Sequence, residues 1–99
     1  KKNAPTAFFA YSDRLAISAV QASLSWGYRV PTDLSFVGFD DIDFASLVYP
    51  PLTSIAQPKL DMGRFAAKKI LNQIEGLPED DLTCTPELRK RDSSGPAPK

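Results

Sequence analysis

The sequence predicts an α/β fold in which two parallel strands are joined by a helix. Residues 6–11 and 34–39 are short apolar runs without polar alternation, as expected of strands covered on both faces. Between them, apolar residues recur at three- and four-residue spacing over 13–26, which is typical of an amphipathic helix. Strand, helix and strand in this order form a βαβ unit, whose strands are nearly always parallel.

The two predicted helices have recognisable ends. Ser12 and Asp13 stand at the start of the first helix, where a side-chain oxygen can accept hydrogen bonds from the N–H groups of the first turn. Gly27 follows this helix, in the position that favours a left-handed C-terminal cap. A second amphipathic helix is predicted over 59–75, and Gly76 ends it.

The remaining segments are predicted to be loops and short extended pieces. Pro50 and Pro51 stop any regular element, and 52–56 forms a short extended segment after them. Residues 82–91 alternate weakly and are predicted to form an edge strand. Serine, glycine and proline dominate the last residues, which we expect to be a disordered tail.

Composition and charge exclude several classes of function. Twelve Lys and Arg residues balance twelve Asp and Glu residues, so the basic surface of a nucleic-acid-binding domain is absent. Histidine is absent and Cys84 is the single cysteine, which excludes histidine-based catalysis, an intrachain disulfide and a thiolate metal cage. No apolar run approaches the roughly 18–20 residues that span a bilayer. We expect no catalytic residue, metal, cofactor or membrane partner.

The ends of the two predicted strands supply the candidate binding site. Ligands of open parallel sheets bind beyond the carboxyl ends of the strands, and these ends carry Ser12 and Asp13 after one strand and Asp40 and Asp41 after the other. Neighbouring strands would bring the two ends to within roughly 5 Å. Such a cluster of oxygens suits ligands rich in hydroxyl or amino donors. The alternative is that Asp40 and Asp41 only bind backbone N–H groups of their own loop.

An acidic window surrounds these residues. Between Arg29 and Lys59 there is no Lys or Arg, whereas four aspartates lie there: Asp33, Asp40, Asp41 and Asp43. We expect this window to be locally negative, which disfavours phosphate or DNA and favours a sugar or an amine. The order Asp41-Ile42-Asp43 also resembles the Asp-x-Asp of phosphotransfer hydrolases, although Phe44 stands where that pattern has a small hydroxylated residue.

Three ordered motifs resemble the lactose-repressor (LacI/GalR) family of bacterial transcription regulators. T-A-F-F-A-Y-S-D-R-L-A at 6–16 is similar to the family's strand–helix junction, which carries Asn-Asp where this chain has Ser-Asp. G-Y-R-V-P-T-D-L-S-F-V-G-F-D-D at 27–41 and P-P-L-T-S-I-A-Q-P at 50–58 resemble two further family motifs in the family's order. The resemblance covers 4–91.

The resemblance implies the C-terminal part of a two-lobed effector-binding module of the periplasmic-binding-protein type. Residues 1–50 would belong to the C-terminal lobe, and 51–82 would cross over and supply a helix of the N-terminal lobe. Residues 83–92 would return as a strand of the C-terminal lobe, and 93–99 would form the tail. Operator DNA would be a partner only through an N-terminal domain outside this chain.

The resemblance also implies roles for individual residues. Asp40 corresponds to the family's ligand-contacting aspartate, and Ser12 stands at the position of its asparagine. Asp13 matches the family's aspartate, as a ligand contact or as a helix-start residue. Ser12, Asp13 and Asp40 form the expected effector-binding set. The family dimerises through the first helix and the segment after the acidic turn, which implies a homodimer interface made of Ile17, Gln21, Leu24, Phe44, Leu47, Val48 and Tyr49.

The function implied by the resemblance is that of a cytoplasmic regulator without enzymatic activity. It would be a repressor that binds a sugar or sugar derivative between its lobes and thereby controls DNA binding allosterically. One alternative is a solute-binding protein for sugar uptake on the same fold. A less favoured alternative is a phosphotransfer enzyme that uses Asp41 and Asp43.

Overall fold

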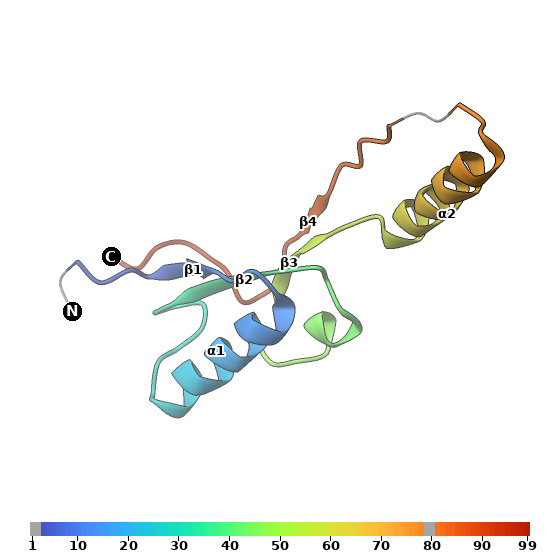
Figure 1. The fold of residues 1–99 in the computed structure, drawn as a ribbon. Coiled ribbons are helices and arrows are strands. Elements are labelled where there is room, and N and C mark those ends of the chain that lie inside the picture. The colour runs from blue at the N-terminus through green and yellow to red at the C-terminus, as the bar shows by residue number, and fades with distance from the viewer. Residues whose placement is uncertain (1–2, 79–80) are drawn as a thin grey trace. The chain divides into compact units, whose positions relative to one another are not determined.

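A computed structural model of the chain describes residues 3–78 and 81–99, and these divide into two compact units. The sheet unit comprises Lys1–Ala56 with Glu87–Lys99, and the helix unit comprises Gln57–Pro86. Figure 1 labels most of the elements, which are, in chain order, β1 (Ala7–Phe9), α1 (Asp13–Ser25), β2 (Ser35–Phe39), the 3₁₀ helix η1 (Asp43–Ser46), β3 (Thr53–Ala56), α2 (Lys59–Glu75) and β4 (Glu87–Arg89).

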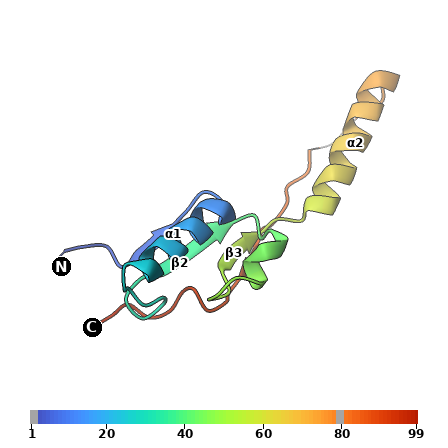
Figure 2. The ribbon, with the colours of Figure 1, turned by 90° about the horizontal axis from the view of Figure 1, so that it is seen from below.

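The sheet confirms the predicted parallel βαβ unit. Its strand order is β1-β2-β3-β4; β2 pairs in parallel with both β1 and β3, and β4 runs antiparallel to β3. Both α1 and the turn that contains η1 lie on one face of this sheet (Figure 2). Residues Thr53, Ser54 and Ile55 of β3 pair with β2, and the chain passes into the helix unit after Ala56.

Helix α1 begins and ends close to where the sequence predicts. The Oγ of Ser12 accepts a hydrogen bond from the N–H of Leu15 at 3.2 Å and so caps the first turn. At the other end Gly27 has a φ of +91°, a conformation that glycine adopts without steric cost. The face of α1 toward the sheet carries small residues, among them Ala16 and Val20, which allows the helix to approach closely.

The loop that leads into β2 is closed by Asp33. Its Oδ2 accepts a hydrogen bond from the Arg29 N–H at 2.8 Å, and the Arg29 guanidinium forms an ion pair with Oδ1 at 3.2 Å. The side-chain hydrogen bond from Arg29 lowers the pKa of Asp33 below its ordinary value. The contribution of this contact to stability is therefore complete above the ordinary aspartate pKa and is lost as the pH falls through the lowered one.

The expected disordered tail is in part an ordered component of the sheet unit. Ser93 is 0% exposed; its Oγ donates to the Phe36 carbonyl at 2.6 Å and accepts from the Thr53 N–H at 2.8 Å. Ser94 and Gly95 also form hydrogen bonds, with Thr53 and with Ser35. The prediction of disorder is wrong for these residues because composition does not reveal that buried backbone groups of β2 and β3 need partners there.

The helix unit contains the predicted second helix with the predicted bounds. Gly76 ends α2 in the left-handed conformation, with a φ of +72°. No residue of α2 is buried, although its first turns and the returning segment enclose a pocket of about 360 Å³ whose lining includes Met62, Phe65, Leu82 and the half-buried Cys84. Among residues 3–78 and 81–99, no helix has the length and apolarity needed to cross a membrane.

We expect Ser93→Ala to lower the free energy of unfolding by about 2–4 kcal/mol, because it leaves the Phe36 carbonyl and the Thr53 N–H buried without their partner. Urea unfolding followed by the fluorescence of Trp26 measures this loss. The matched control is Ser25→Ala, which removes an exposed hydrogen bond to the Ala22 carbonyl and should change stability by less than about 0.5 kcal/mol. Equal stability of the Ser93 variant and the wild type would contradict the role of the tail.

We expect Gly38→Ala to destabilise the sheet unit by about 1–3 kcal/mol, because the new methyl group would overlap the carboxylate of Asp13. Thermal unfolding followed by circular dichroism measures the effect. In Gly63→Ala, the control, the added methyl group meets no atom within 4 Å, and the change should be neutral or stabilise α2 by up to about 1 kcal/mol. A Gly38 variant as stable as the control would mean that Asp13 does not need this space.

Candidate functional site

The two strand ends that carry the candidate residues lie side by side, as the sequence predicts. Phe9 near the end of β1 pairs with Val37 of β2, and the Ala10 N–H donates to the Val37 carbonyl at 2.9 Å. Because the strands are parallel, Ser12 after β1 and Asp40 after β2 follow the same edge of the sheet. The structure therefore brings the two predicted site segments together.

The backbone of the acidic turn adopts an unusual conformation. Asp40 has a φ of +110° and Asp41 a φ of +53°, both in the region that favours glycine. Aspartate tolerates such values better than most residues, but each typically costs on the order of 1–3 kcal/mol unless the surroundings compensate. Residues held in this way concentrate at functional sites.

Hydrogen bonds donated by three consecutive N–H groups hold this turn. The Asp40 N–H donates to the Ile55 carbonyl at 2.8 Å and so extends the pairing of β2 with β3. The Asp41 N–H donates to the Oγ of Ser54 at 3.0 Å, and the Ile42 N–H donates to Oδ2 of Asp13 at 2.8 Å. Both β3 and the start of α1 therefore contribute to the shape of the turn.

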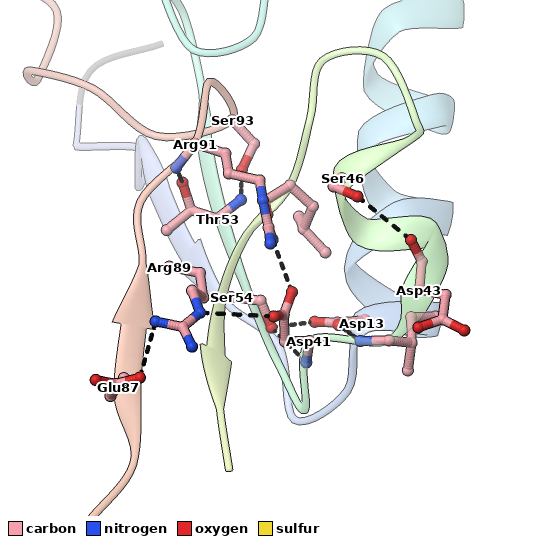
Figure 3. A network of polar contacts seen from close by, with 12 residues as sticks. Asp13, Asp41, Asp43, Ser46, Thr53, Ser54, Glu87, Arg89, Arg91 and Ser93 are labelled. Atoms are coloured by element: carbon pink, nitrogen blue, oxygen red, sulfur yellow. Dashed lines mark hydrogen bonds and ion pairs between the residues drawn. The ribbon is translucent and has the colours of Figure 1, made fainter. Parts of the chain in front are cut away.

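Asp13 is buried beneath the turn. Its side chain is 1% exposed, and its Oδ1 accepts a hydrogen bond of 2.6 Å from the Oγ of Ser54 (Figure 3). Together with the bond from Ile42, this gives each carboxylate oxygen a donor. The Ser54 hydroxyl thus donates to Asp13 while it accepts from Asp41, and this links three segments. Sequence analysis missed Ser54; the hydroxyl residues in the otherwise apolar segment 52–56 were its only signal.

Asp41 faces two arginines from the C-terminal part of the chain. Its Oδ1 lies 2.8 Å from Nη1 of Arg91, and its Oδ2 lies 3.9 Å from Nε of Arg89 (Figure 3). Nη1 of Arg91 also donates to the Leu52 carbonyl at 2.8 Å. Oδ1 of Asp41 is buried and has no hydrogen bond among the described residues, so the contact with Arg91 is an ion pair without an aligned hydrogen bond.

Within the window that the sequence predicts to be locally negative, the charge of Asp41 is compensated by these two arginines. The compensating cations lie outside the window, on and just after β4, where antiparallel pairing places Arg89 opposite Ser54. The signal that could have identified them is two cations spaced two residues apart, which places both on one face of an extended strand. The two arginines lie far from Asp41 in the sequence, so no local pattern predicts that they pair with it.

The predicted dimer residues form a largely exposed apolar patch on α1 and around η1. Phe44, Leu47 and Tyr49 are 65%, 74% and 81% exposed. Nε2 of Gln21 donates to the Tyr49 carbonyl at 3.4 Å, which joins the two parts of the patch. Ile17 and Val48 are half-buried against the core and line a pocket of about 580 Å³, and Leu24 is also half-buried.

Comparison with known proteins agrees with this geometry. Residues 1–94 match the family model described as a periplasmic binding protein-like domain. The chain is 42% identical to the ribose operon repressor of Haemophilus influenzae over 83 residues. This alignment covers 84% of the chain and 25% of the repressor.

Two solved structures of regulators are similar over almost the whole chain. A LacI family transcriptional regulator from Mycobacterium smegmatis has a TM-score of 0.88 and 34% identity, over 98% of this chain and 36% of the regulator. Another from Enterococcus faecium, solved with bound ribose, has a TM-score of 0.79 and 33% identity, over 99% of this chain and 36% of the regulator.

The chain spans about a quarter of the length of the Haemophilus repressor. The relatives named here are repressors and regulators rather than enzymes, in agreement with the expectation of a protein without enzymatic activity. The matched domain and these relatives place the chain in the LacI/GalR family, as part of its periplasmic-binding-protein-like domain.

Proposed function

We propose that the chain is the effector-sensing part of a cytoplasmic LacI-type transcriptional repressor, which binds a sugar or sugar derivative and thereby controls the binding of operator DNA by another domain. The observation that carries the proposal is the placement of Ser12 and Asp40 at one edge of the parallel sheet. Family membership and the repressors among its relatives support the regulatory role and favour it over solute uptake.

A polyol fits the chemistry of the proposed site. The carboxylate of Asp40 can accept hydrogen bonds from two neighbouring hydroxyl groups of a sugar. Ser12 uses its oxygen to accept the N–H of Leu15, and its hydroxyl proton can donate to a ligand oxygen. The ribose bound to the Enterococcus relative makes ribose a suitable first probe.

Asp13 supports the proposed site through its hydrogen bonds to the residues around the acidic turn. Its two oxygens bind Ser54 and Ile42, and its burial leaves no surface for a sugar. The sequence left open a ligand contact or a helix-start role for Asp13, and its burial disfavours the contact. Asp13 begins α1, and we propose that its carboxylate also shapes the turn that presents Asp40. Direct contact with the effector is assigned to Asp40 and Ser12.

The exposed apolar patch is proposed as the homodimer interface. An exposed surface with Phe44, Leu47 and Tyr49 is unfavourable in water and is typical of a surface that binds another protein. A dimer would allow the effector state of two copies to act together on DNA, in the manner of a two-state allosteric regulator.

We expect Asp40→Asn to weaken effector binding by about 10- to 100-fold, because the amide loses the charge and one acceptor of the hydrogen-bonded carboxylate. Asparagine tolerates a positive φ, so the turn should remain folded. Isothermal titration of the intact regulator measures binding, and a thermal melt measures folding. The probes are ribose and cellobiose, the second being the sugar in the solved complex of the similar regulator CelR.

Asp43→Asn is the control for this experiment. It neutralises another aspartate close by in the chain, the exposed Asp43 of η1, and effector binding should remain unchanged. If Asp40→Asn binds the sugar as tightly as the wild type does, the proposed contact is wrong.

We expect the double variant Phe44→Asp, Leu47→Asp to weaken dimerisation by at least about 10-fold, because two unpaired charges would have to be buried in the interface. Sedimentation velocity over a range of protein concentrations measures the dimer–monomer equilibrium. Leu15→Asp serves as the control, since Leu15 is also an exposed apolar residue of α1 but lies outside the predicted patch. A dimer that survives the double change and dissociates in the control would locate the interface elsewhere.

A further inference from the structure

Asp41 lies next to the proposed effector contact, and its carboxylate is committed to partners within the chain. Its side chain is 20% exposed, and that of its partner Arg91 is 21% exposed. Charges that are largely withdrawn from water interact more strongly than a surface pair and are screened less by salt. This places the ion pair apart from the exposed Arg29–Asp33 and Lys69–Asp81 pairs.

Arg91 is itself held in a fixed position. Its guanidinium donates to the Leu52 carbonyl at 2.8 Å, and its backbone N–H donates to Oγ1 of Thr53 at 2.9 Å. Leu52 and Thr53 are buried at the start of β3, so the guanidinium of Arg91 is anchored to the interior of the sheet unit. An anchored cation can hold the Asp41 carboxylate in one place, which a mobile surface arginine could not do.

The strands that hold Asp41 are also the strands by which the chain leaves and re-enters the sheet unit. β3 ends at Ala56, directly before the helix unit, and β4 begins at Glu87, directly after it. Asp41 contacts both strands, through the Ser54 hydroxyl of β3 and through Arg89 of β4. The turn that presents Asp40 is therefore coupled to the relative register of the two connecting strands.

We propose that Asp41 is a positioning residue: its ion pair with Arg91, supported by Arg89, keeps the Asp40–Asp41 turn in the conformation that meets the effector. The inference rests on the proposed function, in which Asp40 contacts the ligand. The same ion pair couples β3 and β4 to effector affinity. Displacement of either strand would move the arginines away from Asp41 and release the turn.

The test compares Asp41→Asn with the wild type in the absence of ligand. Asparagine retains the N–H that bonds to Ser54 and tolerates the positive φ, so the substitution removes little more than the charge. Hydrogen exchange measured by NMR should become at least 10-fold faster at the amides of 40–42 and stay within twofold at Val20, in the buried face of α1. Unchanged exchange at 40–42 would overturn the proposal.

Effector binding provides the second measurement, with ribose and cellobiose as probes in the intact regulator. Asp41→Asn should weaken binding of the sugar that the wild type binds by at least fivefold, without losing the cooperative thermal transition. Arg91→Gln should weaken binding at least as much, because it also loses the hydrogen bond to the Leu52 carbonyl. The double variant should be no worse than Arg91→Gln, because the ion pair is already broken there. Arg91→Lys, which keeps the charge, should restore most of the affinity.

The outcomes separate this inference from the proposed function. Loss of binding in Asp40→Asn together with wild-type affinity in Asp41→Asn would overturn the positioning role and leave the effector site intact. Additive losses in the double variant would likewise show that Asp41 and Arg91 act independently. If the wild type binds neither sugar, the hydrogen exchange at 40–42 decides the positioning role by itself.

Discussion

A buried carboxylate joins three parts of the sheet unit that lie far apart in the sequence. Asp13, at the start of α1, accepts hydrogen bonds from Ile42 in the loop after β2 and from Ser54 in β3. A buried charge without donors is strongly disfavoured, so the folded state requires all three segments to be in place together. The same requirement explains Gly38, where any side chain would overlap the carboxylate. The helix start, the acidic turn and β3 are thus positioned by one charged group.

Hydroxyl groups occupy much of the interior that large apolar side chains fill in other domains. Among the described residues, Leu52 is the only large apolar side chain that is less than 2% exposed, whereas Thr53, Ser54 and Ser93 are as deeply buried. Buried hydroxyl groups are directional, and when every one has a partner they specify a single arrangement more sharply than apolar contacts do. This is also the physical reason why the order of the tail escaped prediction: Ser93 is fixed by the unpaired backbone groups that it meets, and a sequence rich in serine and proline does not reveal them.

Local patterns were sufficient to predict α1, α2 and the parallel pairing of β1 with β2, because helix periodicity and helix caps depend on residues that are close together in the sequence. The shared edge of the segments that carry Ser12 and Asp40 also followed, since it needs only that the two strands of one βαβ unit are parallel neighbours. The partners of Asp41 did not follow. Arg89 and Arg91 reach it from the far end of the chain, and their placement depends on the antiparallel register of β4 against β3, which no local pattern specifies.

The neighbouring aspartates have the same chemistry and different surroundings, which is the basis for assigning them different roles. The charge of Asp41 is compensated by Arg91 and Arg89 inside the chain. A sugar hydroxyl that displaced these arginines would leave a half-buried guanidinium without its partner, and this costs more than a neutral hydroxyl returns. Asp40, one residue earlier, shares the edge of the sheet with Ser12. We therefore assign the Asp41 carboxylate to the fold because of its arginine partners, and we propose Asp40 for the effector because it follows the same edge of the sheet as Ser12.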